Sequence, residues 1–296
     1  MADSSPFTVE SFRASDGYGL QYRHYWDSSV SPLAHLVCLH GIQSHAGWYE
    51  RSCSEWSRAG FIVSFLDRRG SGMNKEDRGD APSFRRLLQD LAEFLEHIHG
   101  QPNGTRNLPI FLIGISWGAK LALALSRFRP DNLSGMVLIC PGLCPRVRPP
   151  FSERLRIVWA RLVTPRRLFS IPLNDPELFT ATPRWLDFLR GDSLSLHRAT
   201  ARFLVESVRL DRYLKRVPPY VRVPILLLLA EKDRIINNAA TRRYVEQLPT
   251  PIRQVIEYTG AHHTLEFEPD PECFIADVRA WLEQHAGNAR EYIPSQ

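Results

Sequence analysis

Short apolar runs, rich in β-branched residues, recur along the chain and end in Gly, Asp or Ser. Such runs are typical of strands in a sheet that is covered on both faces. The first two candidate strands, residues 7–14 and 20–26, flank the turn signal SDGYG and predict a hairpin. Six further strands are expected in AHLVCLHG, FIVSFLD, PIFLIGIS, GMVLICPG, VPILLLLAEKD and IRQVIEYTG.

Amphipathic stretches separate these runs. They predict helices near residues 48–59, 83–99 and 117–129, and a closing helix in PECFIADVRAWLEQHA. Strands that alternate with helices in this order indicate an α/β fold. We therefore expect a mostly parallel, eight-stranded sheet with helices on both faces.

The alternation stops after CPGLCP for about seventy residues, in which Arg-rich segments such as ERLRIVWARLV carry apolar residues at helical spacing. We expect residues 145–216 to form a helical cap over the strand ends of one core, which residues 1–144 and 217–287 build together. Residues 288–296 are expected to be a flexible tail. Open α/β sheets bind ligands at the carboxyl ends of their strands, next to this cap.

The net charge of +5 is concentrated in the cap, where 14 Arg and one Lys face seven acidic residues between Pro145 and Arg216. A basic stretch beside a nearly neutral remainder indicates a surface role of its own. The basic residues lack the interleaved aromatics of a base-stacking platform, and no nucleic-acid motif is present. We expect no nucleic-acid partner.

With 296 residues, 44% of them hydrophobic, the chain can bury a large core. Its amino end, MADSSPFTVE, has neither the basic nor the apolar region of a signal peptide, and no apolar run reaches the roughly 18 residues of a membrane span. The five cysteines are odd in number and lack companions at zinc spacing. These features predict a cytoplasmic protein without a disulfide framework or a metal.

The strongest local signal for chemistry is FLIGISWGAKLALAL, in which Gly114, Ser116 and Gly118 form G-x-S-x-G between a strand and a helix. In this context a serine sits on a strained turn with its hydroxyl projecting outward. The alternative is a Gly-rich turn with a capping serine. The flanking strand and helix favour a nucleophile.

A serine nucleophile needs a base, and the base needs an orienting acid. The chain supplies both after Ser116: Asp233 follows the strand ILLLLAEKD, with Glu231 as the rival acid, and the pair His262 and His263 follows the next strand. Neighbouring side chains in an extended loop point to opposite sides, so we expect only one histidine to reach Ser116.

An oxyanion hole needs two backbone N–H donors. One is expected from Trp117, the residue after the nucleophile, and the other from Ile42, in the loop LVCLHGIQSHAGWY. His40 in this loop is expected to be a buried structural histidine. His45 is also better explained by a structural role.

Five segments in this order carry a resemblance to a known family: HGIQSHAGWY, DRRGSG, GISWG, LLAEKDRII and GAHHTLEFE. They resemble the monoacylglycerol lipase and lysophospholipase branch of the α/β-hydrolase superfamily, which is similar to the serine aminopeptidases. The resemblance extends over about residues 7–286 and is weak across 145–216. It is specific for the fold and the triad, and less specific for the substrate.

The resemblance implies the α/β-hydrolase fold, with Ser116 as nucleophile, Asp233 as acid and His263, the histidine of G-A-x-H, as base. It implies no metal and no organic cofactor. One departure is the pair Ala119-Lys120, where relatives commonly carry a second Gly. We expect Lys120 to lie on the helix flank that faces away from the pocket.

The cap would then shape the acyl pocket. Its apolar candidates for lining that pocket are Trp159, Leu162, Phe169, Phe179, Trp185 and Phe188. Its arginines could meet a phosphate headgroup or an anionic membrane surface. The alternative is that the aromatics only pack the cap onto the core and that the arginines form a solvated face.

The sequence thus predicts a serine hydrolase that cleaves carboxylic esters of a lipid-like small molecule, a monoacylglycerol or a lysophospholipid, through an acyl-enzyme. A short-chain or polyester-type esterase, an amino-terminal peptidase and an acyltransferase remain as alternatives on the same fold. The strongly basic cap argues against the peptidase, which should offer a carboxylate to a substrate ammonium. A non-catalytic ligand-binding protein is the alternative from another class.

Overall fold

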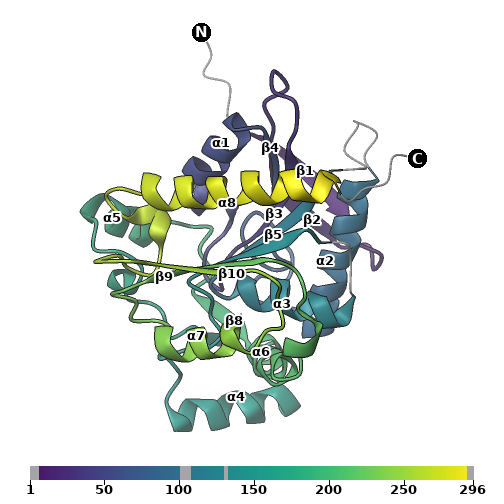
Figure 1. Cartoon of the computed structure of the whole chain (residues 1–296). Coiled ribbons are helices and arrows are strands. Elements are labelled where there is room, and N and C mark those ends of the chain that lie inside the picture. Colours follow the sequence, from purple (N-terminus) through teal and green to yellow (C-terminus); the bar gives the residue numbers. More distant parts are fainter. Residues whose placement is uncertain (1–6, 101–107, 130–132, 292–296) are drawn as a thin grey trace.

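The computed structural model describes residues 7–100, 108–129 and 133–291, with no side chains described beyond residue 287. Its centre is an eight-stranded sheet (Figure 1). Across the sheet the strands follow the order β1 (Thr8–Arg13), β2 (Gly19–Tyr25), β4 (Phe61–Leu66), β3 (Ala34–Leu39), β5 (Ile110–Ile115), β6 (Gly135–Ile139), β9 (Ile225–Ala230) and β10 (Arg253–Tyr258).

The sheet is parallel except for β2, which runs antiparallel to both β1 and β4. The four strands β3, β4, β6 and β9 are buried at every residue, as expected of strands covered on both faces. The predicted fold class and the expected strands are confirmed.

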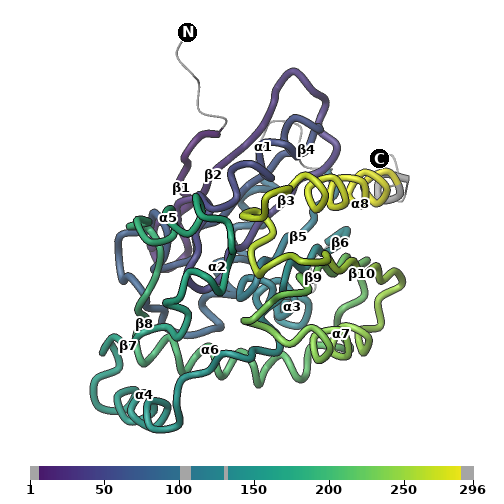
Figure 2. Tube along the Cα trace, turned by 90° about the vertical axis from the view of Figure 1, so that its left-hand side faces the viewer, coloured from purple at the N-terminus to yellow at the C-terminus, as the bar shows by residue number. Residues whose placement is uncertain are grey.

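Helices cover both faces of the sheet. On one face lie α1 (Glu50–Arg58) and α8 (Glu272–Glu291), and on the other lie α2 (Phe84–His99), α3 (Gly118–Phe128) and α7 (Asn238–Glu246) (Figures 1 and 2). The sequence reading did not include α7. Helix α8 runs four residues into the expected tail 288–296, and the rest of that tail lies outside the described residues.

The segment between β6 and β9 includes residues 145–216, which the sequence predicts to form a cap, and we use this name for them. It contains α4 (Phe151–Val163), the short antiparallel pair β7 (Leu168–Ser170) and β8 (Arg198–Thr200), α5 (Pro183–Gly191) and α6 (Ala201–Leu214). Helix α4 lies at the outer edge of the molecule, with α6 between it and the core (Figures 1 and 2).

Short 3-10 turns complete the chain: η1 (Ala46–Tyr49), η2 (Pro176–Leu178), η3 (Pro218–Tyr220) and η4 (Leu265–Phe267). The loops that end at η1 and η4 follow β3 and β10, so both start at the carboxyl edge of the sheet. No helix in the described part of the chain combines the length and the apolar composition that a membrane crossing requires.

Candidate active site

Ser116 lies on the sharp turn from β5 into α3. Its φ of 51° is in the left-handed region that favours glycine. The glycines on either side allow the chain to pass closely: a Cβ at Gly114 would lie 2.6 Å from Ala119 Cα, and one at Gly118 would lie 2.3 Å from the Leu39 carbonyl oxygen. The strained turn presents a partly exposed serine at the carboxyl edge of the sheet.

The structure brings Ser116, His263 and Asp233 into one hydrogen-bonded chain. The distance from Ser116 Oγ to His263 Nε2 is 2.9 Å, and that from His263 Nδ1 to Asp233 Oδ2 is 2.7 Å. The other carboxylate oxygen, Asp233 Oδ1, accepts the amides of Ile235 and Ile236 at 2.7 and 3.0 Å. Asp233 thus holds the histidine with Nδ1–H donating, which leaves Nε2 free to accept the serine proton.

The neighbouring candidates take other partners. The backbone N–H of His262 donates to Glu268 Oε1 at 2.8 Å, and its Nδ1 lies 3.0 Å from the same oxygen. Glu231, the rival acid, accepts the amide of Gly260 at 2.7 Å. Of the two histidines, it is therefore His263 that lies against Ser116.

The loop after β3 lies directly against the serine. A Cβ at Gly41 would be 3.3 Å from Ser116 Cβ. The amide of Gly41 is engaged by Ser44 Oγ at 2.8 Å. Among the described residues, the backbone N–H groups of Ile42 and Trp117 have no hydrogen-bond acceptor. Both are therefore available to donate to an oxyanion.

His40 is a fixed, neutral part of this loop. Its Nε2 accepts the amide of Arg68 at 2.9 Å, so its Nδ1–H donates to the Gly41 carbonyl at 2.7 Å. Burial, reinforced by the Arg68 charge, lowers the pKa of His40 well below its usual value. This matches the expected structural role.

His45 ties the same loop to the cap. Its Nδ1 accepts the amide of Gly47, so its Nε2–H donates to Asp192 Oδ2 at 2.9 Å. The same carboxylate oxygen accepts Trp48 Nε1–H at 2.8 Å and Ser195 Oγ–H at 2.6 Å. Burial opposes ionisation of Asp192, but these hydrogen bonds outweigh it and lower its pKa. Sequence reasoning missed Asp192, because it belongs to no motif.

Helix α3 is tied to the cap in a similar way. Lys120 is buried, and its Nζ donates to Asp211 Oδ1 on α6 at 2.6 Å. The Trp117 indole N–H donates to Ser207 Oγ at 2.9 Å, also on α6. The side chain of Lys120 is thus committed to a cap helix.

The six cap residues expected to line an acyl pocket divide into two groups. Phe179 packs edge-on against the His263 ring at 6.1 Å, and Trp185 and Phe188 pack on Phe267, the first stacked at 4.4 Å. These three belong to an aromatic cluster that starts beside His263.

The other three candidates lie elsewhere, which corrects the sequence reading. Trp159 and Leu162 on α4 are 65% and 74% exposed, and α4 rests on α6. Phe169 is buried in a separate small cluster with Ile157 and Ala160. Helical spacing identified an apolar stripe on α4, but it could not tell whether that stripe faces inward or outward.

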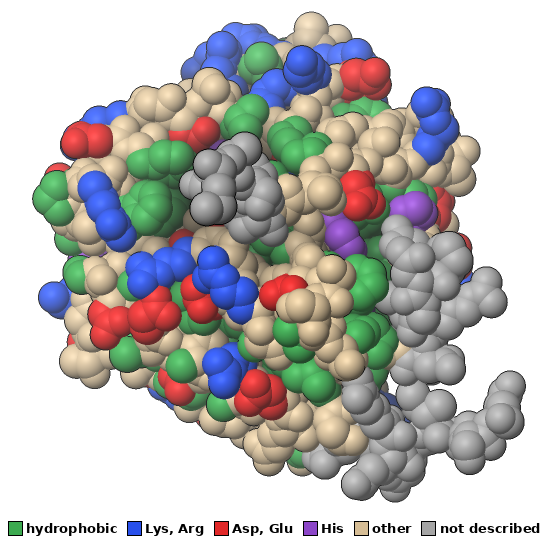
Figure 3. Space-filling view, turned by 90° about the horizontal axis from the view of Figure 1, so that it is seen from above, with side chains coloured by type: hydrophobic (Ala, Val, Ile, Leu, Met, Phe, Trp, Pro, Cys, Tyr) green, Lys and Arg blue, Asp and Glu red, His purple; other side chains and the backbone are tan. Residues whose placement is uncertain are grey.

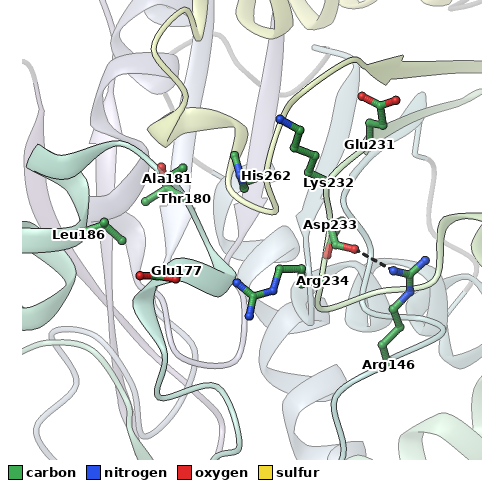
Figure 4. A pocket seen from close by; sticks show the side chains of 10 residues that line it. All are labelled: Arg146, Glu177, Thr180, Ala181, Leu186, Glu231, Lys232, Asp233, Arg234 and His262. Carbon is green, nitrogen blue, oxygen red and sulfur yellow. Dashed lines mark hydrogen bonds between the residues drawn. The ribbon is translucent and has the colours of Figure 1, made fainter.

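A cavity of about 650 Å³ opens on the acid side of the triad (Figure 4). Asp233, His262 and Thr180 line it, whereas His263 is not among its lining residues. Its charged rim consists of Arg146, Glu177, Glu231, Lys232 and Arg234. Most of its lining side chains are charged or polar, in contrast to the aromatic cluster.

Cys140 lies behind the triad, its thiol and the nearest ligand atoms of Asp233 and His263 all within 4.8 Å of one another. Burial, and then the charge of Asp233, raise the pKa of this thiol well above its usual value. Because His263 Nδ1–H is already committed to Asp233, we interpret the neutral thiol as packing against the pair rather than as a metal ligand.

Sequence comparison places the chain among known proteins. The family described as "Serine aminopeptidase, S33" matches residues 30–270. The chain belongs to this family. Within the S33 family it is an α/β-hydrolase of the monoacylglycerol lipase-like branch, as expected from its motifs.

Individual relatives of this S33 chain support the same branch of the family. It is 26% identical over 274 residues to the monoglyceride lipase of Rattus norvegicus, covering 90% of this chain and 88% of that one. The monoacylglycerol lipase structure of Paleococcus ferrophilus superposes with a TM-score of 0.79 at 24% identity, covering 90% of this chain and 99% of the other. A soluble variant of Saccharomyces cerevisiae monoglyceride lipase, in complex with a substrate analog, gives 0.83 at 17% identity, covering 96% and 97%. The two structures show the shared fold, and family and relatives together support an ester hydrolase.

Proposed function

We propose that the chain is a serine carboxylester hydrolase that cleaves lipid-like esters, a monoacylglycerol or a lysophospholipid, through an acyl-enzyme. The observation that carries this proposal is the hydrogen-bonded chain from Ser116 through His263 to Asp233, built on a strained turn. The free amides of Ile42 and Trp117 beside it supply the oxyanion site.

The reaction would proceed in two halves. His263 Nε2 takes the proton of Ser116 Oγ as the oxygen attacks the ester carbonyl, and the Ile42 and Trp117 amides bind the resulting oxyanion. The C–O bond to the alcohol then breaks, and His263 returns the proton to the leaving oxygen. In the second half water attacks the acyl-Ser116 ester with His263 again as base, which releases the fatty acid and restores the serine.

A lipid-like acyl group is supported by the aromatic cluster beside the base. Phe179 contacts the His263 ring, and Trp48 links Phe179 at 5.5 Å to Phe267 at 5.2 Å. An apolar wall beside His263 would favour burial of a hydrocarbon chain, at about 0.8 kcal/mol for each buried CH₂ group. Each added methylene that this wall accommodates should therefore lower KM.

The test is a series of p-nitrophenyl esters of graded acyl length, with a monoacylglycerol and a lysophospholipid, on the wild type and on Ser116→Ala. We expect the highest kcat/KM at medium or long acyl chains, and loss of turnover by at least about 10³-fold in Ser116→Ala. Turnover that survives in Ser116→Ala would refute the mechanism. A maximum at acetate or butyrate would instead favour the short-chain esterase.

An aminopeptidase is the second candidate, and one observation favours it besides the family's description. Glu177 of the cap lines the polar cavity next to Asp233 and His262, where a carboxylate could hold a substrate ammonium. Arg146 and Arg234 line the same cavity and oppose a cation there. Hydrolysis of amino-acid p-nitroanilides faster than of any ester in the series, and its loss in Glu177→Gln, would establish the peptidase.

The cap also supports the expected contact with an anionic membrane surface. Helix α4 exposes Phe151, Leu155, Val158, Trp159, Leu162 and Val163, which recur at helical spacing. Beside them is a surface cleft of about 490 Å³, whose charged lining residues are Glu153 and the four arginines Arg156, Arg166, Arg167 and Arg198. An exposed apolar stripe flanked by arginines suits the boundary between lipid headgroups and acyl chains.

The opposite face of the molecule has a different character. Figure 3 shows this face, on which acidic and basic side chains are interspersed. A membrane that binds the α4 side would therefore orient the molecule.

A further inference from the structure

Arg68 is a buried cation that the proposed reaction does not use. It follows β4, in the segment DRRGSG, and is only 6% exposed. No carboxylate of the described chain lies within ion-pairing distance of its guanidinium, in contrast to the neighbouring Arg69, which pairs with Asp90 at 2.7 Å. Burial lowers the pKa of Arg68 to about 9, so the group is still charged at pH 7.

The partners of this cation are the loop and the aromatic residue that form the candidate oxyanion site. Arg68 Nη1–H donates to the Gly41 carbonyl at 3.3 Å, and Nη2–H donates to the Ile42 carbonyl at 3.2 Å. Its guanidinium carbon lies 4.8 Å from the Trp117 ring centroid and 5.1 Å from that of Phe203. One side chain therefore touches the residues that carry both candidate oxyanion donors.

The contact with the Gly41 carbonyl is the informative one. The carbonyl of Gly41 and the N–H of Ile42 belong to the same planar peptide group. A donor on the carbonyl fixes the plane of that group and polarises its N–H, because hydrogen bonds in series strengthen one another in a dry site. His40 Nδ1–H donates to the same carbonyl at 2.7 Å, so two donors aim this peptide.

An unpaired buried charge is costly for a fold. The aromatic faces of Trp117 and Phe203, the two carbonyls and the more distant charge of Asp67 help to offset that cost. A positive charge behind an oxyanion site is useful at the step where negative charge develops on the substrate.

We propose that Arg68 is a positioning residue for the oxyanion hole: its guanidinium orients and polarises the Gly41–Ile42 peptide and packs against Trp117. This inference rests on the proposed serine hydrolase. It names a residue that acts through Ile42 and Trp117 and makes no contact with substrate.

The test compares Arg68→Met, which keeps the length of the side chain and removes its charge and donors, with Arg85→Met, an exposed arginine, as the matched control. Active sites are first counted by fluorophosphonate labelling of Ser116, so that kcat refers to folded sites. We expect Arg68→Met to lose about 10- to 100-fold in kcat with KM within twofold, a part of the effect of removing an oxyanion donor outright. Arg85→Met should match the wild type.

A second readout separates catalysis from folding. The Ki of a trifluoromethyl ketone, which forms an oxyanion on Ser116, should rise in Arg68→Met by the factor lost in kcat/KM, whereas the Ki of a free fatty acid should not change. Arg68→Lys, with one cationic donor group, should recover part of kcat. Arg68→Gln, neutral but able to donate, replaces the methionine variant if that one does not fold.

Three results would overturn the inference: kcat per labelled site equal to that of the wild type in the neutral variants, a rise in KM alone, or an unchanged Ki for the ketone. A wild type that neither reacts with the fluorophosphonate nor hydrolyses any ester would instead remove the proposed function, and this inference with it. The two failures are therefore distinct.

Discussion

At the scale of single residues, the adjacent histidines differ in what their rings can reach. His263 Nε2 lies 2.9 Å from Ser116 Oγ, whereas the His262 ring borders the polar cavity and pairs with Glu268. Neighbouring side chains along an extended loop point to opposite sides, so only one of the two rings can reach Ser116. The difference can be measured directly.

We expect His263→Ala to lower kcat/KM for p-nitrophenyl esters by at least about 10³-fold, because the serine then has no base. His262→Ala should keep kcat within a few-fold, because its ring contacts neither Ser116 nor Asp233. Equal losses in both variants would mean that the pair acts as a unit, and the reverse order would make His262 the base.

Glu266 gives a prediction for stability. It is fully buried, with Oε1 accepting the amide of Ser52 at 3.0 Å and Oε2 without a partner in the described chain. Burial raises the pKa of Glu266 to about 7, against an ordinary value of 4.5. Between these two pH values the unfolded chain releases a proton that the folded chain retains, so stability falls as the pH rises through this window.

Glu266→Gln has no such proton to lose. We expect the free energy of unfolding of this variant, relative to the wild type, to increase between pH 5 and pH 8 by up to about 3 kcal/mol. Urea unfolding at several pH values measures the difference, in which the other titrating groups cancel. A difference that does not vary with pH would show that Glu266 ionises freely in the folded protein.

The roles of these residues were predictable from the sequence to different degrees. The candidate triad was predicted from local motifs: a serine on a strand-to-helix turn, an acid after a buried strand and a histidine after the next. Arg68 and Asp192 escape such reasoning because their partners are set by the folded chain, as in the contact of His45 with Asp192, 147 residues away.

At the scale of elements, the decisive feature is how the cap is fastened to the core. The end of α5 supplies Asp192, which accepts hydrogen bonds from His45 and Trp48 of the loop that carries Ile42. Close by, the amide of Leu196 donates to the Gln43 carbonyl at 2.9 Å. Buried hydrogen bonds therefore join the cap to the candidate oxyanion loop, and we call this contact the junction.

Asp192→Ala should leave three buried donors without an acceptor. We expect it to lower the free energy of unfolding by about 2–4 kcal/mol. Asp187→Ala, on the same helix but 78% exposed in its pair with Arg190, is the matched control and should change it by less than about 0.5 kcal/mol. Urea denaturation compares the two, and equal losses would show that the junction contributes no more than a surface ion pair.

Element positions were well predicted in the sheet and less well in the cap. Buried parallel strands appear in the sequence as continuous apolar runs, so their positions along the chain could be predicted directly. In the cap, helical spacing predicts an apolar stripe but not the direction in which it faces. Helix α4 buries Ile157 and Ala160 towards α6, and its apolar stripe faces outward.

At the scale of the whole molecule, the exposed stripe of α4 predicts orientation on a membrane. The double variant Trp159→Glu with Leu162→Glu should bind vesicles containing anionic phosphatidylglycerol at least about tenfold more weakly in co-sedimentation, because two large apolar side chains no longer enter the lipid. Its kcat on a soluble p-nitrophenyl ester should not change.

Charge supplies the companion control. Binding of the wild type should weaken with added salt and with vesicles of neutral phosphatidylcholine alone, since the arginines beside α4 attract the anionic headgroups. Unaltered vesicle binding by the double variant, or equal binding to neutral and anionic vesicles, would contradict this orientation.

The connection between β6 and β9 has a consequence for how such a molecule diversifies. These strands are parallel, hydrogen-bonded neighbours, so the sheet fixes where the intervening chain begins and where it ends. The entropy of closing a loop grows only slowly with its length, so this stretch can be lengthened, shortened or exchanged while the serine turn keeps its shape. Evolution or protein engineering can therefore replace this segment to change the substrate selectivity, provided that each replacement offers a hydrogen-bond acceptor to His45.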